Sequence, residues 1–213
     1  MSAKLLIYRD LSAIFVNFVV ITPTGTDMLH FLKCMLQLIL SPRNGWEDIS
    51  LDDDRRHYPT TASYYIFIGI VAASWLIQWA YHPDYFTTVK VIELVIVTYA
   101  IFFVCYFMGT FVMSVALETL VKEGIAIDEH RTRTFTLYSL SLLALVLLLG
   151  LLLPASTPVI WFLPLYVLAI MWKGARYLRI AREKLGWFVT MGFLGILMPP
   201  MLLGLLFKSL LLQ

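Results

Sequence analysis

Residues 135–153 read FTLYSLSLLALVLLLGLLL, and this uncharged stretch decides the fold. Its second half is almost unbroken leucine. A bilayer core about 30 Å thick is crossed by roughly 20 apolar residues in a helix. Because no water reaches that core, the backbone groups of the segment must pair with one another. The stretch is therefore predicted to be a transmembrane helix.

Four more uncharged apolar runs accompany it, at residues 62–81, 94–117, 155–172 and 185–207. The composition agrees, since 60% of the residues are hydrophobic, 14% are charged and the mean hydropathy is +0.82. A soluble domain of 213 residues leaves too much surface exposed to hide so many apolar side chains. The predicted fold is all-α, a polytopic membrane bundle of five transmembrane helices within residues 62–213.

The basic residues collect in alternate connections between these runs. All but two of the 16 lysines and arginines, Lys90 and Lys208, fall before the first run, between the second and third, or between the fourth and fifth. Basic residues are retained on the cytoplasmic side of a membrane. The sequence therefore predicts a multi-pass protein of a bacterial inner membrane, with a cytosolic N-terminus and a C-terminus on the outer side. A net charge of +2 argues against a nucleic-acid partner.

Residues 1–61 are predicted to form a cytosolic or interfacial segment. Within it, residues 28–41 are expected to be an amphipathic helix in the headgroup layer, with an apolar stripe of Leu29, Leu32, Leu36 and Ile39. The polar residues 42–61 are expected to be a linker. Met28 is a candidate internal start, so residues 1–27 are hypothesised to lie outside the natural product.

Several of these features resemble bacterial members of the Yip-domain family. The resemblance covers roughly residues 29–210 and is carried by an apolar helix before Pro42 and Trp46, and by Tyr138-Ser139-Leu140, Trp172-Lys173-Gly174 and Pro199-Pro200. It implies five helices, a cytosolic N-terminus and a C-terminus on the far side. Eukaryotic relatives associate with Rab GTPases in vesicle traffic, but their acidic-glycine-proline motif is not recognisable here. Bacterial members have no agreed activity.

Glu93 is the one acidic residue expected at membrane depth. A carboxylate in such a place can mark an ion pathway. The favoured interpretation is an ion pair with Lys90 at the i, i+3 spacing, close to the outer headgroups.

The basic segment Lys173–Lys184 is expected to continue the fourth transmembrane helix. Lys173, Arg176 and Arg179 recur at every third position and would form a stripe along it. Such a stripe attracts anionic headgroups, and charge that only sets the topology would look the same in the sequence.

Prolines fall inside two predicted spans, Pro164 in the fourth and Pro199 and Pro200 in the fifth. A helix broken by proline can line a transport site. A kink absorbed by packing is the commoner outcome, because membrane helices tolerate proline. The pair Gly69 and Ala73 has the spacing of a close helix contact.

The sequence offers no chemistry-bearing motif. Cys34 and Cys105 lie far apart, and we predict neither a disulfide nor a thiolate metal site from them. Asp128, Glu129 and His130 could ligate a divalent ion, but a solvated loop is favoured. No hydrolase, phosphate-loop or zinc-protease pattern occurs, so no catalytic residue, cofactor or metal is predicted.

The predicted function is that of a non-enzymatic, Yip-like membrane protein that organises lipid or assembles with other membrane proteins, including copies of itself. The candidate residues are Glu93, Lys90, Arg176, Arg179, Pro199 and Pro200. The alternative is a small transporter or channel component that uses Glu93 and the proline-broken fifth helix.

Overall fold

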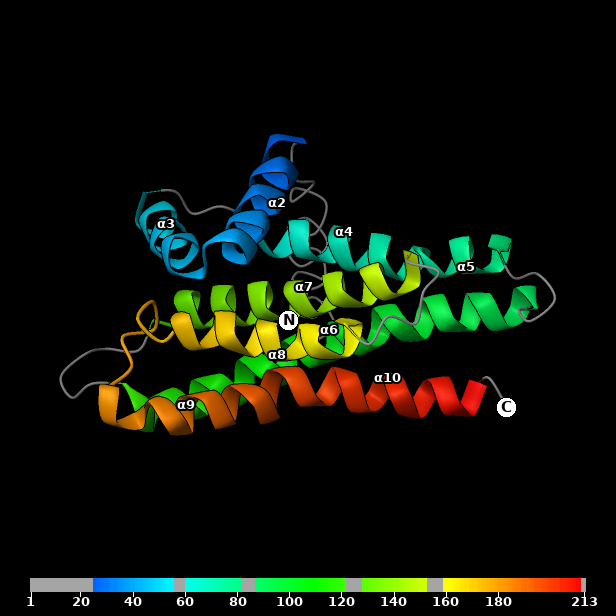
Figure 1. The fold of residues 1–213 in the computed structure, drawn as a ribbon. Coiled ribbons are helices and arrows are strands. Elements are labelled where there is room, and N and C mark those ends of the chain that lie inside the picture. Colours follow the sequence, from blue (N-terminus) through cyan, green and yellow to red (C-terminus); the bar gives the residue numbers. More distant parts are fainter. Residues whose placement is uncertain (1–24, 56–59, 82–86, 122–127, 153–158, 212–213) are drawn as a thin grey trace, which may run out of the picture.

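The computed structural model describes residues 25–55, 60–81, 87–121, 128–152 and 159–211, and in these ranges every regular element is helical. In chain order (Figure 1) they are α2 (Gly25–Leu40), α3 (Pro42–Arg55), α4 (Thr60–Ala73), α5 (Trp75–Tyr81), α6 (Thr88–Leu120), α7 (Glu129–Leu152), α8 (Val159–Lys173), η1 (Arg182–Lys184), α9 (Leu185–Gly192), η2 (Phe193–Leu197) and α10 (Met198–Leu211). The predicted all-α class is confirmed.

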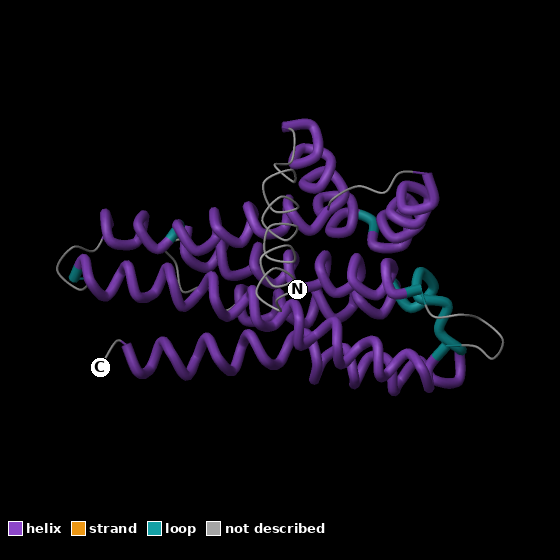
Figure 2. Tube along the Cα trace, turned by 180° about the vertical axis from the view of Figure 1, so that it is seen from behind, coloured by secondary structure: helices purple, strands orange, loops and turns teal. Residues whose placement is uncertain are grey.

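The helices from α4 onward lie side by side along a common direction, which Figures 1 and 2 show from opposite sides. The hairpin formed by α2 and α3 packs against the side of this bundle, towards the end where α8 finishes and α9 begins. The C-terminal end of α10 lies at the opposite end of the bundle. The architecture is that of a helix bundle whose neighbours are connected by short segments.

Four helical stretches are long and apolar enough to cross a membrane: Thr61–Trp79, Thr88–Leu120, Glu129–Leu152 and Arg182–Leu210. They correspond to the predicted spans at 62–81, 94–117, 135–153 and 185–207. The first passes through α4 and α5, which are separated by a turn at Ser74. The last combines η1, α9, η2 and α10.

α8, the part of the predicted span at 155–172 that the structure describes, is shorter than a bilayer requires. α8 has 15 residues, so it extends roughly 22 Å, whereas the hydrocarbon core is about 30 Å thick. The turn predicted around Pro154–Pro158 lies outside the described residues. A count of five crossings therefore stays a prediction.

α7 is the central helix of the bundle. Its residues from Thr134 to Ala144 are all buried, and α4, α6 and α8 pack around it. A helix segment that is enclosed on every side needs no polar face. The leucine-rich part that follows, from Leu145 to Leu152, is only partly covered by protein. The threonine and serine hydroxyls that α7 buries bond mainly to its own backbone: Thr136 donates to the Thr132 carbonyl and Ser141 to the Leu137 carbonyl.

The outer face of α6 is compatible with a position in a membrane. This helix has 33 residues, and large apolar side chains such as Ile96, Phe107 and Phe111 are exposed along it, Phe111 to 69%. Soluble proteins rarely expose a continuous apolar surface of this extent. Water is a poor solvent for such a face, and hydrocarbon is a good one.

α2 covers the region where an amphipathic helix was predicted, but a different face enters the core. Phe31, Met35 and Leu38 are buried against the bundle, whereas Leu29 and Leu36 of the predicted stripe are 69% and 56% exposed. α2 is therefore apolar on two sides, one against protein and one outward. Its place in a headgroup layer stays a prediction.

The polar residues expected to form a linker are helical from Pro42 to Arg55, and this part of the prediction is wrong. Pro42 opens α3 in the first helical position, where its missing N–H is not needed. Trp46 and Ile49 lie one turn apart and are buried at 2% and 3% exposure. Two apolar residues on one face are enough to dock the helix. The sequence pattern did not indicate this, because acidic residues lie between and after them and make the segment polar on average.

Trp46 anchors α3 to the bundle. Its indole nitrogen donates a 3.0 Å hydrogen bond to the Ile170 carbonyl, and its ring stacks on Phe135 at 5.2 Å and on Tyr177 at 5.3 Å. A Cβ on Gly174 would lie 2.6 Å from the Phe135 ring and 3.0 Å from the Trp46 ring. Glycine at 174 is therefore required for these rings to stack.

The fifth predicted span is not broken at its prolines. The helix runs through Pro199 and Pro200 because one π-helical turn precedes them, in which the Met198 N–H bonds to the Phe193 carbonyl. A π turn is a common way to absorb a local mismatch in a helix. The prolines are thus part of a continuous helix packed against α6, as in the commoner outcome named above, and the broken helix of the transporter alternative is not found here.

The close helix contact in the membrane region is made by Gly109 and Gly195. A Cβ on Gly195 would lie 2.6 Å from the Val112 side chain, and one on Gly109 would lie 3.4 Å from the Gly195 carbonyl oxygen. By contrast, a Cβ on Gly69 would meet only the Tyr99 ring, at 4.0 Å. Small residues let membrane helices approach closely, but the pair that does so is not the one predicted.

Candidate functional site

The basic segment after α8 was predicted to continue that helix, but it folds back on the bundle. α8 ends at Lys173, and a series of turns follows in which the Ile180 N–H bonds to the Ala175 carbonyl at 2.9 Å. Arg179 adopts a left-handed conformation with φ of 56°. Ile180 then pairs with Val121 at the end of α6, as a single antiparallel bridge.

Burial alternates along this segment and separates its apolar residues from its cations. Ala175, Tyr177, Leu178 and Ile180 are buried in the core. The cations all point outward and are exposed: Lys173, Arg176, Arg179, Arg182 and Lys184. We call these five residues the basic end. Arg176 and Arg179 therefore share an exposed surface as predicted, although turns, and not a helix, hold them there.

Some cations near the basic end already have partners. Arg131 donates to the Tyr177 carbonyl at 3.3 Å, and its guanidinium lies 5.5 Å from the centre of the Tyr177 ring. Lys184 donates to the Thr119 carbonyl at 2.6 Å. Among the residues that the structure describes, no ion pair involves Arg176, Arg179 or Arg182. Their charge is available to something outside the protein.

Two exposed tryptophans flank the basic end. Trp172 closes α8 at 54% exposure, and Trp187 lies in the first turn of α9 at 65% exposure. The Lys173 ammonium lies 5.5 Å from the centre of the Trp172 ring. Tryptophan rings favour the boundary between headgroups and hydrocarbon. Exposed rings beside exposed cations are therefore typical of a surface at headgroup depth.

Lys90 and Glu93 lie in the first turns of α6, at the end of the bundle opposite the basic end. Glu93 is exposed and Lys90 is half-buried, and no ion pair joins them in the described part of the chain. The predicted pairing is therefore not found. No aspartate, glutamate, lysine or arginine is fully buried among the described residues, and the transporter alternative stays a prediction.

The acidic loop before α7 acts as a helix cap. The Asp128 carboxylate accepts hydrogen bonds from the backbone N–H groups of His130, at 3.0 Å, and Arg131, at 3.3 Å. It also pairs with the Arg131 side chain at 3.4 Å. An aspartate in this place satisfies the free N–H groups of the first helical turn. Glu129 and His130 are exposed, as the favoured interpretation expected, but they lie in the first turn of α7 and not in a loop.

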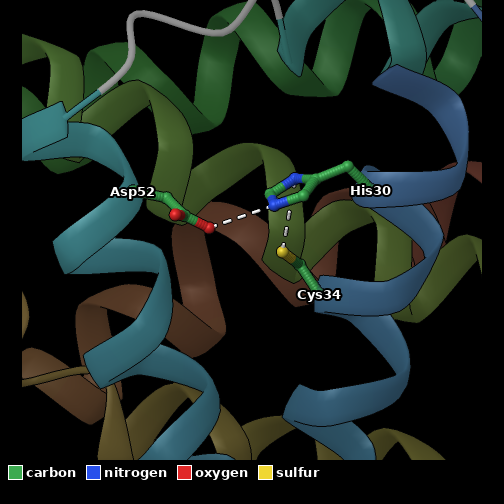
Figure 3. A group of neighbouring side chains, drawn as sticks. All are labelled: His30, Cys34 and Asp52. Carbon is green, nitrogen blue, oxygen red and sulfur yellow. Dashed lines mark hydrogen bonds and ion pairs between the residues drawn. The ribbon is translucent and has the colours of Figure 1, made fainter. Parts of the chain in front are cut away.

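A second group of polar side chains, not predicted from the sequence, lies between α2 and α3 (Figure 3). His30 and Cys34 project from α2 towards Asp52 on α3. The Cys34 sulfur lies 3.7 Å from His30 Nδ1, and His30 Nε2 lies 3.1 Å from Asp52 Oδ2. The available signal was the i, i+4 spacing of His30 and Cys34, which places both on one helix face.

Cys34 lies at the buried end of this group, with 5% exposure. Burial raises the pKa of its thiol above the ordinary value, a hydrogen bond with Tyr138 works in the opposite direction, and the nearby Asp52 carboxylate adds to the rise. His30 and Asp52 have side chains that are 33% and 38% exposed. The group is therefore open to solvent on the His30 and Asp52 side and closed behind Cys34.

Comparisons of the chain with protein-family models, with curated proteins and with solved structures found no match.

Proposed function

We propose that the protein is a non-enzymatic, Yip-like integral membrane protein that gathers anionic lipid around its basic end. The observation that carries this proposal is the exposure of five cations between Trp172 and Trp187, at one end of an apolar bundle. Anionic headgroups attract basic residues near the surface with about 1 kcal/mol each. The absence of a catalytic motif in the sequence is consistent with a role in organising lipid.

The backbone supports the proposal because it presents the cations in a fixed arrangement. The Ala181 N–H bonds to the Leu120 carbonyl at 3.2 Å, and the Gly174 N–H bonds to the Ile170 carbonyl at 3.2 Å. These bonds tie the basic segment to the ends of α6 and α8. A surface held in its binding conformation loses less entropy when a ligand binds, so several headgroups could be held at once.

The proposed orientation places the basic end in the cytosol of a bacterial cell, with the C-terminus outside. It is supported by the charge asymmetry and by the position of the end of α10 at the far end of the bundle. We further propose that the exposed leucines of α2, among them Leu29 and Leu36, contact the lipid boundary. An apolar helix face next to a membrane-embedded bundle has lipid as its nearest apolar solvent.

Kinship with the Yip-domain family is part of the proposal. Residues from three of the motifs behind the resemblance meet in one place: Trp46 packs edge-on against Tyr138 with ring centres 6.4 Å apart, and it lies over Gly174. Motifs that are 36 to 128 residues apart would be expected to converge if they maintain a shared fold. This convergence supports a common architecture, while the lipid role rests on the basic end.

The proposal is tested by counting phospholipids retained by the purified full-length protein, with native mass spectrometry. The variant carries Arg176→Gln, Arg179→Gln and Arg182→Gln, and we expect it to bind anionic phospholipid at least about tenfold more weakly, because each lost charge removes about 1 kcal/mol before salt screening. Binding of zwitterionic lipid should not change.

The matched control carries Arg43→Gln and Arg133→Gln. Both arginines are exposed, but each pairs with a carboxylate on its own helix, Glu47 and Glu129. This control should retain anionic lipid at the level of the unmodified protein. Equal loss in the two proteins would reject the basic end as the site. Retention of lipid by both, together with a stable protein complex that survives removal of lipid, would favour assembly instead.

A further inference from the structure

The side chains of His30, Cys34 and Asp52 bring three different donor types together. One ligand atom from each residue lies within 4.8 Å of the others, and no other group of this kind is found in the described residues. Two ligands on a tetrahedral zinc ion are separated by roughly 3.3–3.7 Å. The two shortest distances involve opposite nitrogens of the His30 ring, 3.7 Å from the Cys34 sulfur to Nδ1 and 3.1 Å from Asp52 Oδ2 to Nε2. Because one zinc ion takes a single imidazole nitrogen, the three ligand atoms, which lie within 4.8 Å of one another, must draw together by roughly 1 Å to reach this range. Small rotations of the side chains would suffice to surround an ion.

The backbone that carries these residues is well anchored. Ser41 alone separates α2 from α3, and the Gln37 amide bonds to the Asp48 carboxylate across the hairpin. At the C-terminal end of α2, the Tyr166 hydroxyl donates to the Ile39 carbonyl at 2.5 Å. The packing of Trp46 fixes α3 from the other side. A site on two packed helices keeps its ligands in register without help from the ion.

We propose that His30, Cys34 and Asp52 bind a zinc ion at the junction of α2 and α3. Thiolate and imidazole donors select zinc over magnesium or calcium, which prefer oxygen ligands. Three protein ligands leave a fourth position open to water or to an added ligand. The thiol proton of Cys34 is released to solvent when the sulfur binds the metal. The Tyr138 hydroxyl, which bonds to Cys34, would support the sulfur from behind.

The same three residues could be read as a nucleophilic thiol with a histidine base, but two observations disfavour that reading. The Cys34 sulfur is buried behind the other two residues, so a bulky electrophile has no approach to it. Reactive cysteines lie in electropositive surroundings, whereas Cys34 has two carboxylates nearby, Asp52 and Asp48, and one lysine, Lys33. A metal ion is small enough to enter between His30 and Asp52 and supplies the positive charge that a thiolate needs.

The test uses the full-length protein, purified in mild detergent, stripped with a chelator and then supplied with Zn²⁺ alone. We expect one zinc ion for each chain by elemental analysis, and a rise in the unfolding temperature with zinc concentration, because the ion binds the folded state. Replacement by Co²⁺ should produce a thiolate-to-metal absorption band. The Cys34→Ser and Asp52→Asn variants should bind zinc at least about tenfold more weakly, and Cys34→Ser should lose the band.

Cys105→Ser is the matched control, because Cys105 is the other buried free thiol. It should retain the ion, the absorption band and the zinc-dependent stability. Asp52 is partly exposed, so the isosteric Asp52→Asn variant should stay folded even if Cys34→Ser does not. The proposal is overturned if wild-type protein with Co²⁺ has no thiolate band, or if Cys34→Ser and Asp52→Asn bind zinc as tightly as wild type. It is also overturned if metal-free Cys34 reacts rapidly with iodoacetamide in a manner that requires His30. All of these outcomes are independent of lipid binding.

Discussion

α7 and the last membrane-compatible helix, Arg182–Leu210, are both rich in leucine, yet the bundle encloses one and leaves the other largely open. In the most apolar part of α7, 61% of the residues are buried, compared with 28% in the last helix. From Thr134 to Ala144, α7 is surrounded by protein and carries buried hydroxyl groups. The last helix faces outward with Leu202, Leu205 and Leu206 exposed by more than half.

This difference teaches that hydropathy alone does not separate a helix solvated by protein from one solvated by lipid. Around α7, stability comes from large interlocking side chains, so removal of one leaves a cavity. Along the last helix, stability comes from a close backbone approach at Gly195, so addition of an atom there forces the helices apart. Substitutions of opposite kinds should therefore damage the two regions.

The largest loss of stability is expected for Trp46→Ala, which removes a ring packed against α7. Loss of the ring removes the stacking on Phe135 and the hydrogen bond to Ile170, and we expect unfolding to become easier by about 3–5 kcal/mol. Thermal unfolding in one detergent measures this. Trp187→Ala is the control in the last helix, where the ring is exposed and the change should be small. Equal destabilisation by both substitutions would contradict the distinction between the enclosed α7 and the open last helix.

A smaller effect is expected for Gly195→Ala in the last helix. The new Cβ would lie 2.6 Å from the Val112 side chain, so overpacking should reduce stability by about 1–3 kcal/mol. Gly204→Ala makes the matched control, because a Cβ there meets nothing within 4 Å. Alanine also favours a helix more than glycine does, so the control should be neutral or slightly more stable. If Gly195→Ala behaved like the control, the close contact would be refuted.

The smallest effect is expected within α7 itself. The Ser139 hydroxyl is buried and has no hydrogen-bond partner among the described residues, and an unsatisfied buried group costs about 1–3 kcal/mol. Ser139→Ala should therefore be neutral or stabilise the protein by about 1 kcal/mol. Ser141→Ala should be slightly destabilising, because Ser141 donates to the Leu137 carbonyl at 2.7 Å. The same unfolding assay compares them, and a clear loss for Ser139→Ala would show that its hydroxyl has a partner.

The sequence predicted the helical class and the long apolar helices because their signal is local and extends over many residues. It could not predict α3, whose docking depends on Trp46 meeting rings far along the chain. It also did not predict that Phe31, Met35 and Leu38 of α2 pack against the bundle, because apolar residues occupy both sides of that helix and hydrophobicity alone cannot choose between them. Choosing requires knowledge of the partner surface, which only the folded bundle supplies.

The two candidate sites, like the fold, could be predicted only in part from the sequence. The exposure of Arg176 and Arg179 follows from their charge, while the turn that holds them depends on the left-handed conformation of Arg179 and on pairing with Val121. The His30, Cys34 and Asp52 group was missed because its third member comes from a segment interpreted as a linker. Once α3 is a helix, Asp52 is brought back over α2.

The π turn at Phe193–Leu197 also determines which way the end of the chain faces. A π turn accommodates one extra residue, and one residue turns an α-helix by about 100°, so the inward side of α10 is rotated relative to that of α9. α9 can therefore contact both α6 and α8, while α10 continues along α6. Deleting a single residue from this turn would swing Met201 and Phe207 away from the bundle and turn part of the outer leucine surface inward, with no change in hydropathy.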